Sequence, residues 1–168
     1  VNVSPVQLST PESGIDEWYD MLKAAKLPAS SIVAEITEGL MINPEALTQR
    51  RLKEIVKSGM QLALDDFGTG YSSLAYLQEM DTDYLKIDKR FVDNIQVGSQ
   101  ELALCEAIIV MAHQLGLKVI AEGIETKLQM QLLLEAGCDY GQGYLFSRPL
   151  NKSSFMALLS DKKVALLK

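Results

Sequence analysis

The sequence predicts an α/β fold of the TIM-like (β/α) barrel type, with about six of the eight β/α units present in this chain. Short apolar runs, typical of buried strands, alternate about six times with amphipathic helix-like runs, which favours a parallel sheet covered by helices. Charged or amide residues stand at or near the ends of these apolar runs. Barrel enzymes build their sites at the C-terminal ends of all strands, whereas open sheets use one switch point, so the barrel is favoured.

The expected elements follow one another along the whole chain. Gly59, Gly116 and Gly137 each stand between a helix-like run and a strand, as expected of a glycine that ends a helix. Pro44 suits the first turn of its helix. The strand candidates are Val1–Ser4, Ile32–Thr37, Gln61–Asp65, Tyr84–Ile87, Lys118–Ala121 and Tyr140–Phe146. The helix candidates are Gly14–Ala25, Pro44–Lys57, Ser73–Gln78, Gln100–Gln114, Thr126–Glu135 and Ser153–Asp161.

The length suits one domain but not a whole barrel. A complete (β/α) barrel needs roughly 250 residues, and this chain has 168 and begins at Val1 without a methionine. We therefore expect residues 1–168 to be the C-terminal part of a single barrel domain, with about two strands preceding them. An unclosed barrel exposes sheet edges, so we expect an isolated fragment to oligomerise or aggregate.

Composition and charge narrow the partners. The formal net charge of −6 disfavours duplex nucleic acid as a general partner. A small anionic substrate is compatible with it if metal ions supply positive charge. Cys105 and Cys138 stand alone in apolar stretches, as buried reduced thiols of a cytoplasmic domain would. No apolar run is long enough to span a membrane, and no signal peptide is visible.

The strongest candidate for metal binding is the pair Asp65 and Asp66, which ends the apolar run 60–64. Neighbours in a strand point to opposite faces, so both reach one site only if the strand is ending there. Close carboxylates raise the pKa of one of them unless a cation neutralises both. A divalent metal ion is the interpretation we favour; the alternative is a helix-capping or loop carboxylate.

Glu35 and Glu38 follow in the segment Ala-Glu-Ile-Thr-Glu. Glu35 lies inside an apolar strand, where a charge is costly unless it is paired or bound to metal. An outward position at a solvated edge is the alternative. Glu38 is a weaker candidate, since it could be a surface or helix-start residue.

Further strand ends carry Lys86, Glu122 with Glu125, and Gln142. Lys86 among carboxylates could stabilise a phosphoryl transition state, or could form a structural ion pair with Asp65, Asp66 or Asp88. Two glycines frame Gln142 and suggest either a tight site wall or a bulge. The one observation that supports Asn2 is its position at a strand end, and a turn residue is the alternative.

The ligand types favour Mg²⁺ or Mn²⁺ over Zn²⁺, because the candidate donors are oxygens. The single histidine, His113, lies in a helix-like run and is a poor ligand candidate. No serine or cysteine sits in an elbow with a histidine partner. The glycine-bearing segment 66–73 matches neither the P-loop nor the dinucleotide-binding spacing, so we interpret it as a flexible loop. Two metal ions about 3.5–4 Å apart, bridged by a hydroxide, are the usual arrangement for phosphodiester hydrolysis.

In these segments the chain resembles the EAL-domain family, the bacterial cyclic di-GMP phosphodiesterases. The resemblance spans all 168 residues and rests on six segments in natural order: VNVS, EITEG, LALDDFGTGYSSL, LKIDKRFV, VIAEGIET and GQGYLFSRPL. It implies a barrel with two Mg²⁺ or Mn²⁺ ions that hydrolyses cyclic di-GMP to linear pGpG.

The resemblance also implies roles for individual residues. Lys86 would orient or stabilise the attacking water, and Gln142 would assist near the same water or the metal shell. Glu125 would support the site, and Glu38 would anchor the loop 66–73. The metal ligands would be Asn2, Glu35, Asp65, Asp66 and Glu122.

The letters Glu-Ala-Leu at 45–47 are not the family's signature triplet, because they fall inside a helix. The resemblance places that triplet, whose glutamate is a metal ligand, upstream of Val1. We therefore expect the full-length protein to be active and this fragment alone to be weak or inactive. The alternatives are a non-catalytic sensor that binds cyclic di-GMP, and an interaction domain that keeps only the barrel. The resemblance also implies a homodimer and, upstream, a sensor or GGDEF-type domain.

Overall fold

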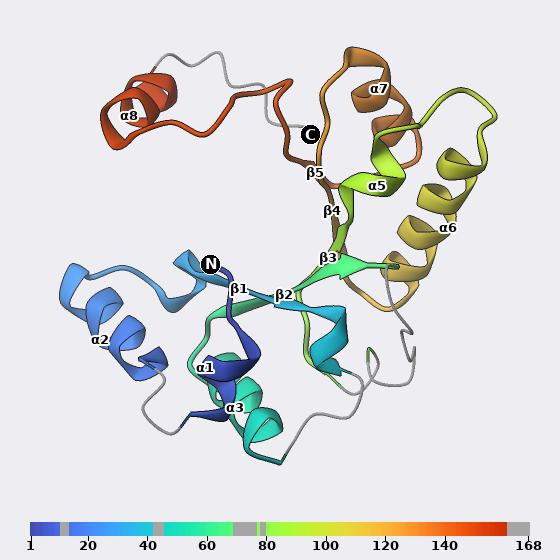
Figure 1. Cartoon of the computed structure of the whole chain (residues 1–168). Helices are drawn as coiled ribbons and strands as arrows, with labels where there is room; N and C mark the ends of the chain where they lie inside the picture. The colour runs from blue at the N-terminus through green and yellow to red at the C-terminus, as the bar shows by residue number, and fades with distance from the viewer. Residues whose placement is uncertain (11–13, 42–45, 69–76, 78–79, 161–168) are drawn as a thin grey trace. The chain divides into compact units, whose positions relative to one another are not determined.

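The computed structural model describes residues 1–10, 14–41, 46–68, 77 and 80–160. The chain divides into two compact units, Val1–Leu85 and Lys86–Lys168, and each is described by itself. The fold is α/β with parallel strands, as the sequence predicts. The strands follow one another in the sheet in the same order as in the chain. The first unit holds β1 (Val33–Thr37), β2 (Gln61–Phe67) and the start of β3 (Tyr84–Ile87), and the second holds the end of β3, β4 (Lys118–Ala121) and β5 (Tyr140–Gly141) (Figure 1).

In the first unit, helices bury the apolar face of β1 and β2. Helix α3 (Ala46–Lys57) turns Leu52 and Ile55 inward, and it contacts β2. Leu62 and Leu64 of β2 are at most 1% exposed. The unit also contains α1 (Pro5–Ser9), α2 (Ile15–Ala25) and the 3-10 turns η1 (Ala29–Ser31) and η2 (Glu38–Met41).

The second unit contains two capped helices: α6 (Gln100–Gln114) contacts β4, and α7 (Lys127–Glu135) contacts α6. The Ser99 hydroxyl accepts the N–H of Leu102 at the start of α6. Thr126 and Gln129 form a capping box at the start of α7. The unit also contains α5 (Lys89–Val92) and α8 (Lys152–Ser160), and α8 has no buried residue.

Several predicted boundaries are wrong, for identifiable local reasons. The expected strand Val1–Ser4 is reduced to a single parallel bridge between Asn2 and Glu35, because Ser4 caps α1. The expected strand Tyr140–Phe146 ends at Gly141. Strand β2 continues to Phe67 instead of ending at Asp65. The sequence reasoning missed α1, α5 and both 3-10 turns, and the helix expected at Ser73–Gln78 lies, except for Leu77, outside the described residues.

The glycine prediction is confirmed. Gly59, Gly116 and Gly137 have φ values of +85°, +79° and +88°, and each accompanies the end of a helix. This left-handed conformation lets the chain reverse into the next strand without a Cβ clash.

The two cysteines are free and buried, as predicted. Burial raises the pKa of the Cys105 thiol to about 12 and that of Cys138 to about 11. Both side chains are therefore protonated at neutral pH and act as packing groups.

Among the described residues, no helix combines the length and the apolar character needed to cross a membrane.

Candidate active site

In the first unit, three candidate ligands lie on one face of the strands. Asn2 forms a parallel bridge with Glu35, and Glu35 pairs with Ala63 in β2. Thr37 pairs with Asp65, two residues further along each strand. Because side chains alternate along a strand, Asn2, Glu35 and Asp65 project from the same face. The small residue Ala63, which pairs with Glu35 and precedes Asp65 by two positions, is buried on the same face.

The backbone conformation at Asp66 bears on whether the side chains of Asp65 and Asp66 can point to one site. Strand β2 does not end at Asp65, but Asp66 has φ +57°, a left-handed conformation that is unusual for a residue with a side chain. This torsion breaks the alternation of side chains. Asp65 Oδ1 accepts the N–H of Asp66 at 3.0 Å and so supports the distorted backbone. Strain of this kind is typical of functional positions.

Glu38 connects the end of β1 to the start of the loop after β2. Its side chain is 2% exposed, and Oε2 accepts the backbone N–H of Gly68 at 3.0 Å. A charge-assisted bond of this type is stronger than one between neutral groups. The contact fits the role expected for Glu38, whereas residues 69–73 of that loop lie outside the described part of the chain.

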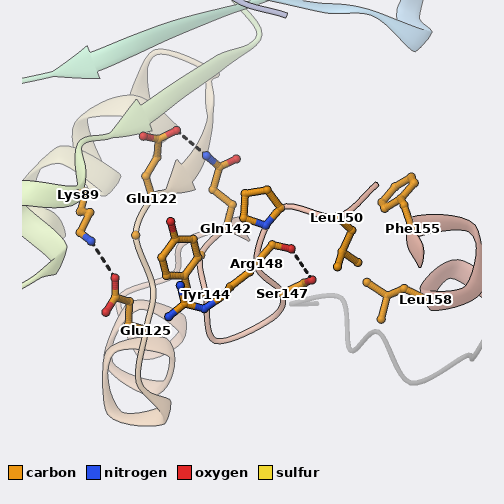
Figure 2. A pocket seen from close by; sticks show the side chains of 13 residues that line it. Lys89, Glu122, Glu125, Gln142, Tyr144, Ser147, Arg148, Leu150, Phe155 and Leu158 are labelled. Carbon is orange, nitrogen blue, oxygen red and sulfur yellow. Dashed lines mark hydrogen bonds and ion pairs between the residues drawn. The ribbon is translucent and has the colours of Figure 1, made fainter. Parts of the chain in front are cut away.

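In the second unit, Lys86, Glu122 and Gln142 meet on one oxygen. Lys86 Nζ lies 2.6 Å from Glu122 Oε1, and Gln142 Nε2 donates to the same oxygen at 2.7 Å. Figure 2 shows the Gln142 amide pointing at Glu122. Lys86 is only 3% exposed, and a buried ammonium group is costly unless it is paired, as it is here with Glu122. The ion pair predicted for Lys86 with Asp65, Asp66 or Asp88 stays a prediction, and Lys86 also pairs with Glu122, which the sequence reasoning did not name.

Glu125 forms an ion pair that the sequence reasoning missed. Lys89 Nζ donates to Glu125 Oε1 at 2.8 Å. The hydrogen bond from Lys89 lowers the pKa of the Glu125 carboxyl, and the same bond raises the pKa of Lys89. The available signal was Lys89 itself, a cation immediately after the strand that carries Lys86.

Two glycines of this unit are required by close contacts. Gly123 has φ +71°, and a Cβ there would collide with the stem of Lys89. A Cβ on Gly143 would collide with the backbone of Ile124. The tight wall proposed around Gln142 is therefore present on the Gly143 side.

The second unit contains a pocket of about 480 Å³, shown in Figure 2. Its walls include Glu122, Glu125 and Gln142, together with Tyr144 and Arg148. The Arg148 guanidinium lies 4.6 Å from the centre of the Tyr144 ring. The size suits a small ligand. Sequence reasoning did not single out Tyr144 or Arg148, because neither interrupts an apolar strand.

The donor chemistry of the first unit fits a hard divalent cation. Two carboxylates and one amide oxygen share a strand face, and oxygen donors are what Mg²⁺ and Mn²⁺ prefer. Within the described residues, no three His, Cys, Asp or Glu side chains are grouped closely enough to hold a metal. The joint ligation predicted for Asn2, Glu35, Asp65, Asp66 and Glu122 stays a prediction.

Comparison with known proteins identifies relatives of both units. The signaling protein YkoW of Bacillus subtilis is 43% identical over 162 residues, which are 96% of this chain and 20% of that protein. The cyclic di-GMP phosphodiesterase NbdA of Pseudomonas aeruginosa is 43% identical over 136 residues, or 81% of this chain and 17% of that protein. The chain thus spans about a fifth of the length of these relatives.

Solved structures agree with the fold. The phosphodiesterase PaMucR in complex with c-di-GMP has a TM-score of 0.85 at 33% identity, covering 92% of this chain and 68% of that one. Klebsiella pneumoniae BlrP1 with manganese and cy-diGMP has a TM-score of 0.79 at 33% identity, covering 89% and 38%.

A family model described as "EAL domain" matches residues 1–149, which hold every candidate residue described above. The chain belongs to the EAL-domain family.

Proposed function

We propose that this chain is part of a phosphodiesterase that hydrolyses cyclic di-GMP to linear pGpG with two Mg²⁺ or Mn²⁺ ions. The observation that carries the proposal is the set of oxygen donors on one strand face of the first unit, Asn2, Glu35 and Asp65. The relative NbdA is a cyclic di-GMP phosphodiesterase, and solved EAL structures contain this nucleotide with manganese or calcium.

We assign metal binding to Asn2, Glu35, Asp65 and Asp66, with Glu122 as a fifth ligand. Bound divalent ions would supply a hydroxide nucleophile at neutral pH and neutralise charge on the phosphate. The ions also account for how a chain of net charge −6 would bind an anionic dinucleotide.

Within the second unit, the three-way contact on Glu122 would serve positioning. Lys86 is buried and its Nζ lies beside the Glu122 carboxylate, so the amine would have little conformational freedom. Gln142 donates to the same oxygen and fixes the carboxylate orientation. In this proposal Lys86 orients the attacking water, and the Lys89–Glu125 pair supports the wall next to it.

The full-length protein provides the test. Purified protein is incubated with cyclic di-GMP and Mn²⁺ or Mg²⁺, and the products are separated by chromatography. We expect pGpG to form with the wild type, and turnover to fall at least about a hundredfold in Asp65→Asn and Lys86→Met. Gln131→Ala, a change on the exposed face of α7, is the matched control.

Measuring cyclic di-GMP affinity beside turnover distinguishes the enzyme from the alternative, a sensor that binds the nucleotide without hydrolysing it. Calorimetry measures cyclic di-GMP affinity in the same preparations. Tight binding without product in the wild type would support the sensor and overturn the enzyme proposal. A homodimer and an upstream sensor or GGDEF-type domain belong to the same proposal, and light scattering of the full-length protein tests the dimer.

A further inference from the structure

Two segments of the chain repeat one local structure at a distance of 57 residues. Strand β2 begins two residues after Gly59, and β4 begins two residues after Gly116, both glycines with positive φ. The fifth residue from the start of each strand is a carboxylate, Asp65 or Glu122. The residue that follows has a left-handed backbone in both, with φ +57° at Asp66 and +71° at Gly123.

The strand that comes next also begins alike in the two segments. An Asp-Tyr pair stands there, Asp83-Tyr84 at the start of β3 and Asp139-Tyr140 at the start of β5. Asp83 Oδ2 accepts the N–H of Leu62 at 2.8 Å, and Asp139 Oδ2 accepts the N–H of Val119 at 2.8 Å. Leu62 and Val119 are both the second residue of the preceding strand.

The two tyrosines form similar bonds to the residues just before Leu62 and Val119. The Tyr84 hydroxyl donates to Gln61 Oε1 at 3.3 Å, and Lys118 Nζ donates to the Tyr140 hydroxyl at 3.4 Å. Gln61 and Lys118 are the first residues of β2 and β4. In each unit, an Asp-Tyr pair thus forms hydrogen bonds with the first two residues of the preceding strand.

The register of the strands relates these contacts to the far ends of the same strands. In the second unit Ile120 pairs with Tyr140, and Ala121 pairs with Gly141. The same offset continues to Glu122 and Gln142, whose side chains bond at 2.7 Å. In the first unit the N–H of Asp83 also donates to Leu62 O at 2.9 Å. Asp65 lies three residues beyond Leu62, just as Glu122 lies three residues beyond Val119.

We propose that Asp83 and Asp139 are positioning residues, which pin the starts of β2 and β4 and thereby place the carboxylates of Asp65 and Glu122 at the opposite ends of these strands. Neither aspartate would touch substrate or metal. The functional part of the proposal rests on the phosphodiesterase activity proposed above, whereas the pinning itself does not.

The test uses full-length protein with Asp83→Ala, Asp139→Ala and the corresponding asparagine variants. Asparagine keeps one acceptor oxygen, so it should preserve the bond to the strand. Hydrogen exchange is followed by mass spectrometry over residues 60–66 and 117–123. We expect Asp83→Ala to accelerate exchange about tenfold in the first segment only, and Asp139→Ala in the second only.

Steady-state hydrolysis of cyclic di-GMP supplies the second readout. We expect both alanine variants to lower kcat by about tenfold or more with KM changed by less than about threefold, because small misplacements of catalytic groups are costly. The asparagine variants should restore most of kcat. The control is Asp81→Ala, an exposed aspartate two residues before Asp83.

Several results would overturn the proposal. Wild-type exchange in the alanine variants would show that no pinning occurs, and kcat values equal to that of Asp81→Ala would show that it does not position the site. If an alanine variant does not fold, its asparagine partner decides, because exchange that differs from the wild type contradicts the acceptor role. If the wild type lacks hydrolysis, the proposed function fails, and hydrogen exchange alone still decides whether the aspartates pin the strands.

Discussion

At the scale of single residues, the backbone of Asp66 combines a strained torsion with the metal-binding role that we propose for its side chain. Asp66 has φ +57° at a position where the second segment has Gly123 with φ +71°. The left-handed conformation costs a residue with a Cβ about 1–2 kcal/mol relative to glycine. A glycine at position 66 would adopt this torsion without the cost, whereas the aspartate places a second carboxylate next to Asp65.

This opposition predicts the effect of two substitutions. Asp66→Gly should raise the free energy of unfolding by up to about 1 kcal/mol in the absence of metal, whereas Asp66→Ala should lower it. Urea unfolding of both variants in EDTA measures the difference. Equal stability of the glycine and alanine variants would contradict the strain argument.

Glu125 and Lys89 give a pH-dependent prediction with a defined sign. The folded-state pKa of Glu125 is lowered from its ordinary value of 4.5, chiefly by the Lys89 hydrogen bond. The ionised carboxylate therefore contributes to stability above pH 4.5, and this contribution is lost as the pH falls through the lowered pKa. The two side chains are 48% and 43% exposed, so salt should weaken the effect.

In Lys89→Met we expect the pKa of Glu125 to rise toward its ordinary value. An NMR titration of the Glu125 carboxyl carbon measures this shift directly. Lys127→Met, which removes an exposed lysine nearby in the sequence, is the control and should leave the titration unchanged.

At the scale of elements, the start of α7 connects helix capping to the packing of α5. Gln129 is 6% exposed, and its Oε1 accepts the N–H groups of Glu125 and Thr126, at 2.8 Å each. Its Nε2 donates to Val92 O of α5 at 3.1 Å. One buried amide thus satisfies the backbone of two helices and the turn that carries Glu125.

Alanine substitutions at this capping box should differ in a definite order. Thr126→Ala should lower the free energy of unfolding by about 1 kcal/mol, as loss of a helix cap does. Gln129→Ala should cost about 2 kcal/mol or more, because it removes hydrogen bonds to three backbone groups that are buried or partly buried. Gln131→Ala on the exposed face should have an effect within about 0.5 kcal/mol. Chemical denaturation checks the order, and a Gln129 effect no larger than that of Gln131 would contradict it.

At the scale of the whole molecule, divalent ions should stabilise the full-length protein. A ligand that binds only the folded state raises stability by mass action, by about 2.7 kcal/mol at a hundredfold excess over Kd. We expect saturating Mn²⁺ to raise Tm in the wild type and EDTA to reverse the rise. Asp65→Asn should lose most of the rise, and Cys105→Ser, a buried non-ligand, should keep it despite a lower starting Tm.

The sequence by itself determined the parallel α/β pattern, the glycines that end helices and the polar groups at strand ends, because these follow from local periodicity and local torsions. Glu35 and Lys86 stood out as charges inside apolar runs, which burial makes costly. The EAL membership also rests on the sequence, since six segments in order carry it.

Only the tertiary structure decided which side chains meet. It paired Lys86 with Glu122 and Lys89 with Glu125, gave Asp66 its left-handed backbone, and joined Asp83 to Leu62 and Asp139 to Val119. These contacts join residues up to 36 positions apart. Spacing along the chain predicts which face a side chain takes, but the register between strands decides its partner, because a shift of one residue turns every side chain to the other face.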